Sequence, residues 1–126
     1  MFAIYFNREE FRCKGISCGS DGTNCGQDTV DAELVRILDD LRAYFDKPII
    51  VTSGNRCEEW NRTIGGSKNS QHVLGRAADI VVQGIDSLIV YNYLDKKYSD
   101  AFGFGTYNEF THVDSRGTKA RWNQRV

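Results

Sequence analysis

The chain has 126 residues, of which 40% are hydrophobic and 26% are charged. This composition is typical of a globular domain and argues against a disordered or fibrous chain, so we expect a single domain, residues 1–126. The 16 basic and 17 acidic residues give a net charge of −1 and form no run of one sign. We therefore expect no nucleic-acid partner.

Two further expectations concern where the protein acts. No apolar stretch approaches the roughly 20 residues that cross a bilayer, so we expect no membrane insertion. Glu9 and Glu10 stand where a signal peptide has its apolar run, so we expect a protein made in the cytosol without a signal peptide.

The four cysteines are an even set, and three of them lie in a glycine-rich stretch at 13–26. They are Cys13, Cys18, Cys25 and Cys57. The stretch has too little apolar content to hold itself together, so the cysteines are expected to crosslink it. Disulfides come first among three open interpretations, ahead of a structural zinc bound by four thiolates and of free thiols. Spacings of five and seven lack the close Cys-x-x-Cys pairs of a strong zinc motif, and a cytosolic protein keeps its thiols reduced.

The predicted secondary structure, in chain order, indicates an α+β fold. Apolar residues recur at helical spacing from 30 to 45, after Asp28 or Thr29 as candidate helix starts. The elements that follow are a strand at 49–52, a short helix at 58–63, a loop at 67–71, a strand at 77–82, a helix from about Asp86, and closing strands at 102–107 and 110–115. We expect a small antiparallel sheet flanked by helices.

Both histidines of the chain have an aspartate nearby. His72 precedes Asp79 by seven residues, and His112 is followed by Asp114. Two imidazoles, one carboxylate and an open fourth position form the ligand set of a catalytic zinc. Asp79 lies within an apolar run, where a carboxylate needs a cation as its partner. The residues favour zinc at His72, Asp79 and His112, while spacing alone also allows histidines satisfied by hydrogen bonds and an Asp79–Arg76 pair.

A series of motifs resembles one peptidase family. They are Ser53-Gly54-Asn55-Arg56-Cys57, Asn61, Gly65-Gly66, Asn69-Ser70-Gln71-His72, Gly75-Arg76-Ala77-Ala78-Asp79-Ile80 and Phe110-Thr111-His112-Val113-Asp114. Their order and spacing resemble the zinc D-alanyl-D-alanine carboxypeptidase family, which includes the L-alanyl-D-glutamate endopeptidases of phage endolysins, from about 11 to 122. The resemblance implies a hedgehog/DD-peptidase-like fold, Zn²⁺ bound by the two histidines and Asp79, and hydrolysis of peptidoglycan stem peptides.

The resemblance also implies a general base. In such enzymes a carboxylate three residues before the last histidine takes a proton from the attacking water, and here that residue is Glu109. Side chains three apart on a flat strand face opposite sides, so Glu109 needs a turn to reach the metal. Asp114 is the second candidate for the base, and its other expected role is to orient a histidine.

Further side chains are expected to contact substrate. Arg56 matches a family arginine that holds substrate or the oxyanion, for which a fixed guanidinium is suited. Ser70 matches a substrate-binding position and Gln71 stands beside it. Tyr107 and Trp122 are candidates for the walls of the cleft or for the core.

The expected function is that of a monomeric peptidoglycan peptidase acting at the bacterial cell wall. An L-alanyl-D-glutamate endopeptidase is preferred to a D-alanyl-D-alanine carboxypeptidase, because a short catalytic domain suits a phage lysis protein released by a partner membrane pore. The alternatives are a non-catalytic zinc-containing wall-binding module and a virion structural component. The presence of Glu109 and Arg56 argues against a non-catalytic module.

Overall fold

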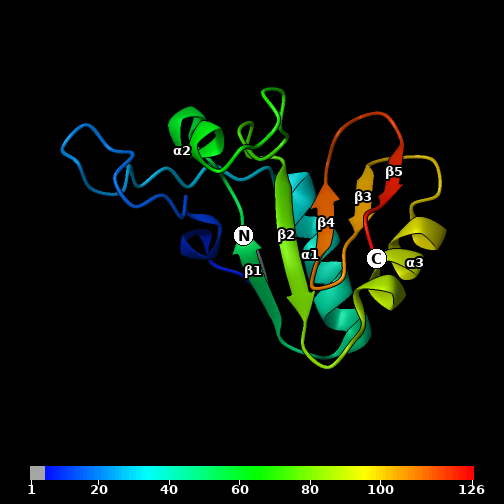
Figure 1. The fold of residues 1–126 in the computed structure, drawn as a ribbon. Helices are drawn as coiled ribbons and strands as arrows, with labels where there is room; N and C mark the ends of the chain where they lie inside the picture. The colour runs from blue at the N-terminus through cyan, green and yellow to red at the C-terminus, as the bar shows by residue number, and fades with distance from the viewer. Residues whose placement is uncertain (1–4) are drawn as a thin grey trace.

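A computed structural model describes residues 5–126 and has a five-stranded sheet at its centre (Figure 1). The strands are β1 (Ile49–Ser53), β2 (Ala77–Val82), β3 (Gly103–Thr106), β4 (Thr111–Asp114) and β5 (Ala120–Asn123). Their spatial order is β1-β2-β4-β3-β5, and all neighbours are antiparallel except β3 and β5, which are parallel. The expected α+β fold is confirmed, and β5 is an addition to the predicted strands.

Three α-helices and one 3₁₀-helix complete the described chain. They are η1 (Arg8–Phe11), α1 (Ala32–Phe45), α2 (Glu58–Thr63) and α3 (Ser87–Lys97). Figure 1 shows α1 behind β2 and β4, with α3 beside it, while α2 lies above the sheet. Among residues 5–126, no helix combines the length and the apolar content that crossing a bilayer requires.

The start of α1 differs from the prediction. The helix begins at Ala32 with Asp31 as its N-cap, later than a start directly after Asp28 or Thr29. The backbone before it is committed elsewhere, because Thr29 N–H donates to Asn55 Oδ1 (3.0 Å) and Asp31 N–H donates to the Gly75 carbonyl (2.8 Å). These bonds hold residues 29–31 in a non-helical conformation, so the helix begins only at Ala32.

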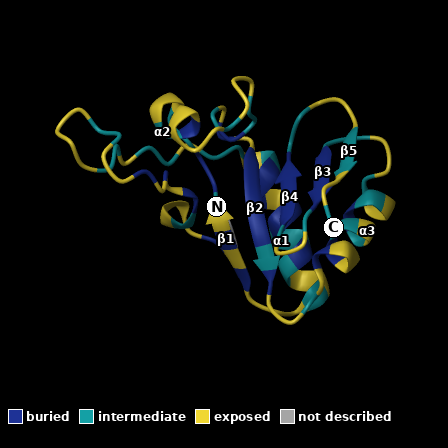
Figure 2. Cartoon of the chain, viewed as in Figure 1, coloured by how far each residue is buried: buried dark blue, intermediate teal, exposed yellow. Residues whose placement is uncertain are grey.

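The hydrophobic core lies between α1, α3 and one face of the sheet. Its fully buried members include Leu34, Leu38, Leu41, Ile80, Leu94, Phe104 and Val113. Figure 2 shows the central strands buried along most of their length, with exposed residues on the outer sides of the helices. Ala78, Ile80 and Val82 of β2 belong to this core, so alternation along the strand turns Asp79 to the opposite face.

The segment after β1 joins the N-terminal part of the chain to the loop before β2. The β1–β2 register shifts between Val51 and Ser53, which places Ser53 opposite Asp79. Asn55 N–H then donates to the Phe11 carbonyl (2.8 Å) and Arg56 N–H to the His72 carbonyl (3.0 Å). A Cβ on Gly54 would lie 2.7 Å from the Phe11 backbone, so this close approach requires glycine.

Candidate metal centre

His72, Asp79 and His112 meet on the face of the sheet opposite the core. Asp79 of β2 and His112 of β4 are directly paired, and His72 lies in the loop before β2. Asp79 Oδ1 is 3.3 Å from His72 Nε2 and 3.1 Å from His112 Nδ1. All three residues are buried, and their ligand atoms lie within 4.8 Å of one another. The structure thus brings together the three residues that the sequence predicted as metal ligands.

Hydrogen bonds behind the two imidazoles select which ring nitrogen faces the centre. His72 Nδ1 lies 2.8 Å from the Gly54 carbonyl and donates to it, which leaves the Nε2 lone pair toward Asp79. His112 Nε2 lies 2.7 Å from Asp114 Oδ2 and donates to it, which leaves Nδ1 toward Asp79. When both imidazoles are neutral, two nitrogen lone pairs and a carboxylate oxygen face one another, and a divalent cation would relieve their repulsion. The donor set therefore fits zinc.

The charge of the centre follows from these contacts. When no cation is bound and the imidazoles are protonated, burial raises the pKa of Asp79, but hydrogen bonds and charge from His112 and His72 outweigh it, so this pKa lies well below its usual range. Burial lowers the pKa of His112, but its bonds to Asp114 and Asp79 outweigh that effect and raise the pKa. Asp79 is consequently an anion at neutral pH and available as a ligand.

Asp114 stands behind His112 and does not line the cleft. It is fully buried, and Arg116 holds it through Nε to Oδ1 (2.8 Å) and Nη2 to Oδ2 (2.7 Å). Burial raises the pKa of Asp114, but the bonds from His112 and Arg116 outweigh it and hold this pKa well below its usual range. A Cβ on Gly103 would lie 2.4 Å from the Asp114 carboxylate, so Gly103 makes room for it. This geometry suits orientation of His112.

Arg56 is fixed beside Asp79 from three sides. Its Nη2 is 3.5 Å from Asp79 Oδ2, its Nε donates to Ser53 Oγ (3.2 Å), and its Nη1 donates to Asn61 Oδ1 (3.1 Å). Burial lowers the pKa of Arg56 while the Asp79 charge opposes this, and the group stays a cation. Three of the five guanidinium N–H groups are thus engaged, which leaves two for a ligand.

A cleft of about 400 Å³ opens over the centre. Its lining residues are Arg56, Ser67, Asn69, Ser70, Gln71, His72, Asp79, Tyr107, Phe110, His112, Arg116 and Trp122. Asp79 is the only carboxylate among these described residues. The cleft therefore presents two arginines and several hydrogen-bonding groups around one metal-ligand set.

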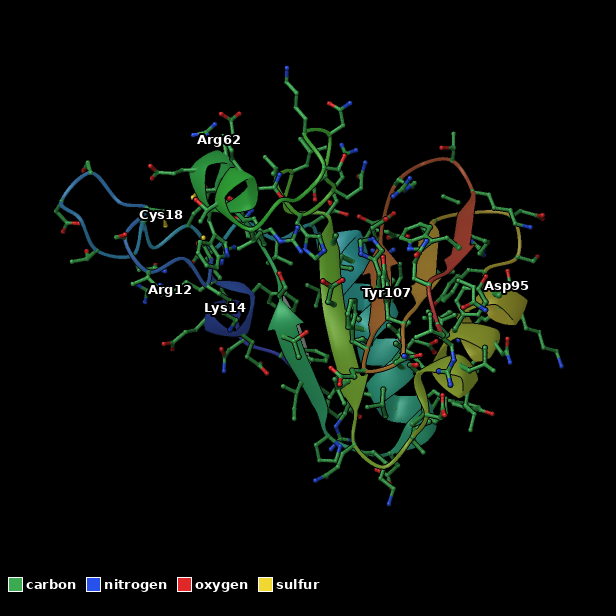
Figure 3. The ribbon with its side chains drawn as sticks, in the orientation of Figure 1. Arg12, Lys14, Cys18, Arg62, Asp95 and Tyr107 are labelled. Carbon is green, nitrogen blue, oxygen red and sulfur yellow. The ribbon has the colours of Figure 1, made fainter. Side chains whose placement is uncertain are left out.

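Aromatic side chains form one wall of this cleft. Tyr107 and Phe110 stack with ring centroids 4.3 Å apart, and the Trp122 ring lies 4.9 Å from that of His112. Figure 3 labels Tyr107. Trp122 Nε1 donates to the Tyr107 hydroxyl oxygen (2.9 Å), so the hydroxyl hydrogen of Tyr107 remains free to donate. A Cβ on Gly105 would lie 2.2 Å from Trp122 Nε1, so Trp122 crosses β3 at a glycine. Tyr107 and Trp122 are thus wall residues.

Ser70 and Gln71 also line the cleft, with different hydrogen bonding. Ser70 Oγ accepts the backbone N–H of His72 (3.1 Å), so this hydroxyl shapes the loop as well as facing the cleft. Gln71 Oε1 is buried without a hydrogen-bond partner among the described residues. An unpaired buried acceptor is costly, and a donor from a ligand would satisfy it.

Glu109 lies outside the cleft. It is exposed at the bend between β3 and β4, so the turn that its expected role requires is present. In this arrangement it lines a separate cavity of about 120 Å³ with residues that include Asp86 and Ser87. Its flanking residues Tyr107 and Phe110 line the metal cleft, but its own carboxylate does not.

Sequence reasoning missed two features of this site. Arg116 pairs with Asp114 and lines the cleft, and its position two residues after Asp114 on the same side of an extended chain is a signal that could have revealed it. Gly103 and Gly105, spaced two apart on β3, make room for Asp114 and Trp122. Their spacing marks a strand crossed by larger side chains on one face.

Comparison with known proteins identifies the family. The family model described as Peptidase M15 matches residues 4–114, a range that contains all three candidate ligands, Arg56 and Asp114. Searches of curated proteins and of solved structures return no significant match. The zinc dependence of this family agrees with the His72–Asp79–His112 group. The chain belongs to the Peptidase M15 family and is a zinc metallopeptidase of the kind that acts on peptidoglycan.

Proposed function

We propose that the protein is an endopeptidase that hydrolyses the bond between L-alanine and D-glutamate in peptidoglycan stem peptides. His72, Asp79 and His112 hold the zinc in this proposal. Zinc in such a site supplies Lewis-acid activation of the scissile carbonyl and of the attacking water. The remaining steps depend on how the chain binds the peptide and moves a proton.

The observation that carries the endopeptidase assignment is a second cavity that adjoins the metal cleft. This cavity, of about 610 Å³, shares the lining residue Asn69 with the cleft and also contains Asn61, which accepts from Arg56. A peptide lying across the metal can therefore continue past Asn69. An endopeptidase needs room on both sides of the scissile bond, whereas a carboxypeptidase needs room for one terminal residue on the leaving side.

The charges around the two cavities complement a stem peptide. D-Glutamate continues the stem through its γ-carboxyl group, so its α-carboxylate is free and lies close to the scissile nitrogen. Arg56 and Arg116 line the metal cleft, and the second cavity is lined by two cations, Arg62 and Lys68, and one acid, Glu58. A guanidinium binds a carboxylate through two parallel hydrogen bonds. We assign the α-carboxylate of D-glutamate to Arg116, which keeps three guanidinium N–H groups beyond the two bonded to Asp114.

Polar groups of the cleft have matching roles in this proposal. The two unengaged N–H groups of Arg56 and the hydroxyl hydrogen of Tyr107 are donors for the oxygen that becomes negative when the carbonyl is attacked. Gln71 Oε1, unpaired among the described residues, is an acceptor for a substrate N–H. Ser70 offers its hydroxyl hydrogen from the rim of the same loop.

Glu109 is proposed as the general base, with Asp114 orienting His112. Asp114 is enclosed by His112 and Arg116, so its carboxylate has no path to a water in the cleft. Glu109 is exposed and makes no hydrogen bond or ion pair with the rest of the described chain. Rotation of the bend at 108–109, between two residues that line the cleft, would carry its carboxylate over the metal. Apo geometry of catalytic groups commonly tightens when substrate binds.

Incubation of the purified protein with peptidoglycan tests this function. We expect new amino groups to appear, to stop when a zinc chelator is added, and to resume when zinc is restored. Release of free D-alanine instead would establish a D-alanyl-D-alanine carboxypeptidase, and binding to the wall without new amino groups would establish a non-catalytic module. We also propose the endolysin role that the resemblance implies. It predicts that a suspension of bacterial cells treated with the purified protein loses turbidity.

A further inference from the structure

A second group of metal-ligand side chains lies away from the cleft. The four cysteines, Cys13, Cys18, Cys25 and Cys57, gather between the N-terminal segment and the start of α2, and their sulfur atoms all lie within 4.8 Å of one another. Figure 3 labels Cys18 beside α2, where the N-terminal loop passes the helix. None of the four is in a disulfide.

The spacing of the sulfur atoms matches a tetrahedral metal site. Cys13 Sγ is 3.9 Å from Cys18 Sγ and 3.9 Å from Cys57 Sγ. Four sulfurs bound to one zinc at about 2.3 Å are about 3.8 Å apart at the corners of a tetrahedron. Two disulfides would instead divide the group into pairs with bonds of about 2.05 Å. Cys13 has two equally near sulfur neighbours and so shows no such pairing.

Backbone N–H groups point at the sulfur atoms. Cys25 N–H donates to Cys18 Sγ (3.4 Å), Gln27 N–H to Cys25 Sγ (3.5 Å), and Trp60 N–H to Cys57 Sγ (3.3 Å). Such bonds favour thiolates and orient them, as hydrogen bonds around metal ligands do. Three of the four sulfurs thus already have outer contacts of the kind that support a bound metal.

The loop around the cysteines is shaped to hold them together. Asn24 Nδ2 donates to the carbonyls of Cys13 (2.8 Å) and Gly15 (2.5 Å), while its Oδ1 accepts the N–H of Gly26 (2.7 Å). A Cβ on Gly15 would lie 2.6 Å from Cys18 Sγ. Gly15 is therefore required by the close approach of Cys18.

We propose that Cys13, Cys18, Cys25 and Cys57 bind a second zinc ion, which is structural. Zn²⁺ replaces the four thiol protons, which pass to solvent, and no oxidant or reductant is consumed. Four protein ligands close the coordination sphere, so this ion has no open position for chemistry. The site replaces the disulfides that the sequence favoured, because the sulfur atoms form one group instead of two pairs.

The second zinc would fasten the glycine-rich segment to the active-site half of the chain. Cys57 is the N-cap of α2 and directly follows Arg56, whose side chain reaches Asn61 of the same helix. Cys13 lies two residues after Phe11, whose carbonyl accepts the N–H of Asn55. The ion would thus link Cys13, near the backbone that binds Asn55, to Cys57, which directly follows Arg56. It would do so in a part of the chain that has few buried apolar residues of its own.

Metal content and cobalt spectroscopy of the full chain test the second site. We expect two zinc equivalents per chain by atomic emission. After replacement by Co²⁺ under reducing conditions, we expect the strong near-ultraviolet thiolate-to-cobalt absorption of a four-sulfur site. His72→Ala should keep one equivalent and the full thiolate band, so the cysteine site is scored separately from the peptidase centre, whatever the activity of the protein.

Variants locate the ion and control for misfolding. Cys18→Ser should lower the metal content by one equivalent and weaken the thiolate band, while Ser20→Ala in the same segment should change neither. Gly15→Ala keeps all four ligands and should weaken cobalt binding by about tenfold or more through displacement of Cys18. Absence of the thiolate band from the parent protein, or two disulfides in its intact mass before reduction, would overturn the proposal without depending on any variant.

Discussion

The two groups of metal-ligand side chains differ in what holds them. Asp79 and His112 come from paired strands, and hydrogen bonds to Gly54 and Asp114 orient the two imidazoles. The cysteines come from an irregular segment and from the cap of a short helix. A sheet can hold a site of three ligands rigidly while it stays open to a cleft, whereas a loop with little core depends on the ion to keep its four ligands together.

The difference predicts opposite consequences of metal removal. Loss of zinc from the His72–Asp79–His112 centre should stop catalysis and leave the sheet intact, because strand pairing and the core do not depend on the ion. Loss of zinc from the cysteines should loosen residues 13–26 and the start of α2. The changes below are ordered from the largest expected effect to the smallest.

His72→Ala should abolish peptidoglycan hydrolysis. It removes one of three ligands and the bond to the Gly54 carbonyl, so the centre no longer holds its zinc. Assays of hydrolysis and of bound zinc would measure both losses, with Leu74→Ala, an exposed residue of the same loop, as the control. Undiminished zinc affinity at the His72–Asp79–His112 centre of His72→Ala would show that His72 is not a ligand.

Glu109→Gln should lower kcat by on the order of 10² to 10⁴, the usual contribution of positioned proton transfer. The substitution keeps the size of the side chain and removes its charge from an exposed bend, so stability should not change. Steady-state hydrolysis of a soluble stem peptide gives the measurement, and Glu59→Gln on α2 is the matched control. Full activity of Glu109→Gln would remove Glu109 from the mechanism.

Asp114→Asn should weaken zinc binding at the His72–Asp79–His112 centre by about 10- to 100-fold, the usual cost of losing a partner of a ligating histidine. The charge that holds His112 and Arg116 is lost, while the cysteines keep their ion. Zinc titration in a competing chelator measures the affinity, with Asp100→Asn as the exposed control. Activity that returns at high zinc fits an orienting role, and activity that stays absent with zinc bound would make Asp114 the base.

Asp86→Asn should have the smallest effect, confined to the sheet half of the molecule. Hydrogen bonds from Leu88 N–H and Arg125 lower the pKa of Asp86, which caps α3. A lowered folded-state pKa stabilises the fold above the unfolded pKa, and this stability is lost as the pH falls through the folded value. Asp86→Asn should therefore be less stable than the parent at pH 7, with a difference that shrinks as the pH falls below about 4 and vanishes only below the lowered folded-state pKa of Asp86.

Urea unfolding of metal-free Asp86→Asn and metal-free parent protein, at pH 7 and at a pH below the folded-state pKa of Asp86, checks this prediction. The thiolate-to-cobalt band should be the same in Asp86→Asn and in the parent at pH 7, because α3 and the cysteines lie in different parts of the fold. A constant difference in stability across the pH range would show that the Asp86 charge is not the cause.

The sequence predicted those parts of the fold that carry a periodic apolar pattern. α1 buries Leu34, Leu38 and Leu41 on one side, and such spacing is visible without tertiary information. β5 was not predicted because Ala120–Asn123 is only four residues long, so its alternation of apolar and polar residues is too short to stand out, and none of its side chains is fully buried. Its strand state depends on parallel pairing with β3, which no local pattern encodes.

The candidate site divides in the same way. Ligand types and motif order were enough to select His72, Asp79 and His112, because the chemistry of zinc restricts the choice of side chains. The direction in which Glu109 points depends on the bend between β3 and β4. The contact of Arg116 with Asp114 depends on the path of the chain just after β4. These are tertiary features, and a motif fixes only the positions of such residues along the chain.

Mass analysis of peptidoglycan fragments released by the zinc-loaded protein tests the central claim most directly. The account predicts fragments with a new amino-terminal D-glutamate and a matching carboxyl-terminal L-alanine, produced by the parent protein and absent with His72→Ala. Intact stem peptides after complete zinc loading, or fragments that His72→Ala releases equally well, would contradict the assignment of the His72–Asp79–His112 centre as the catalytic site.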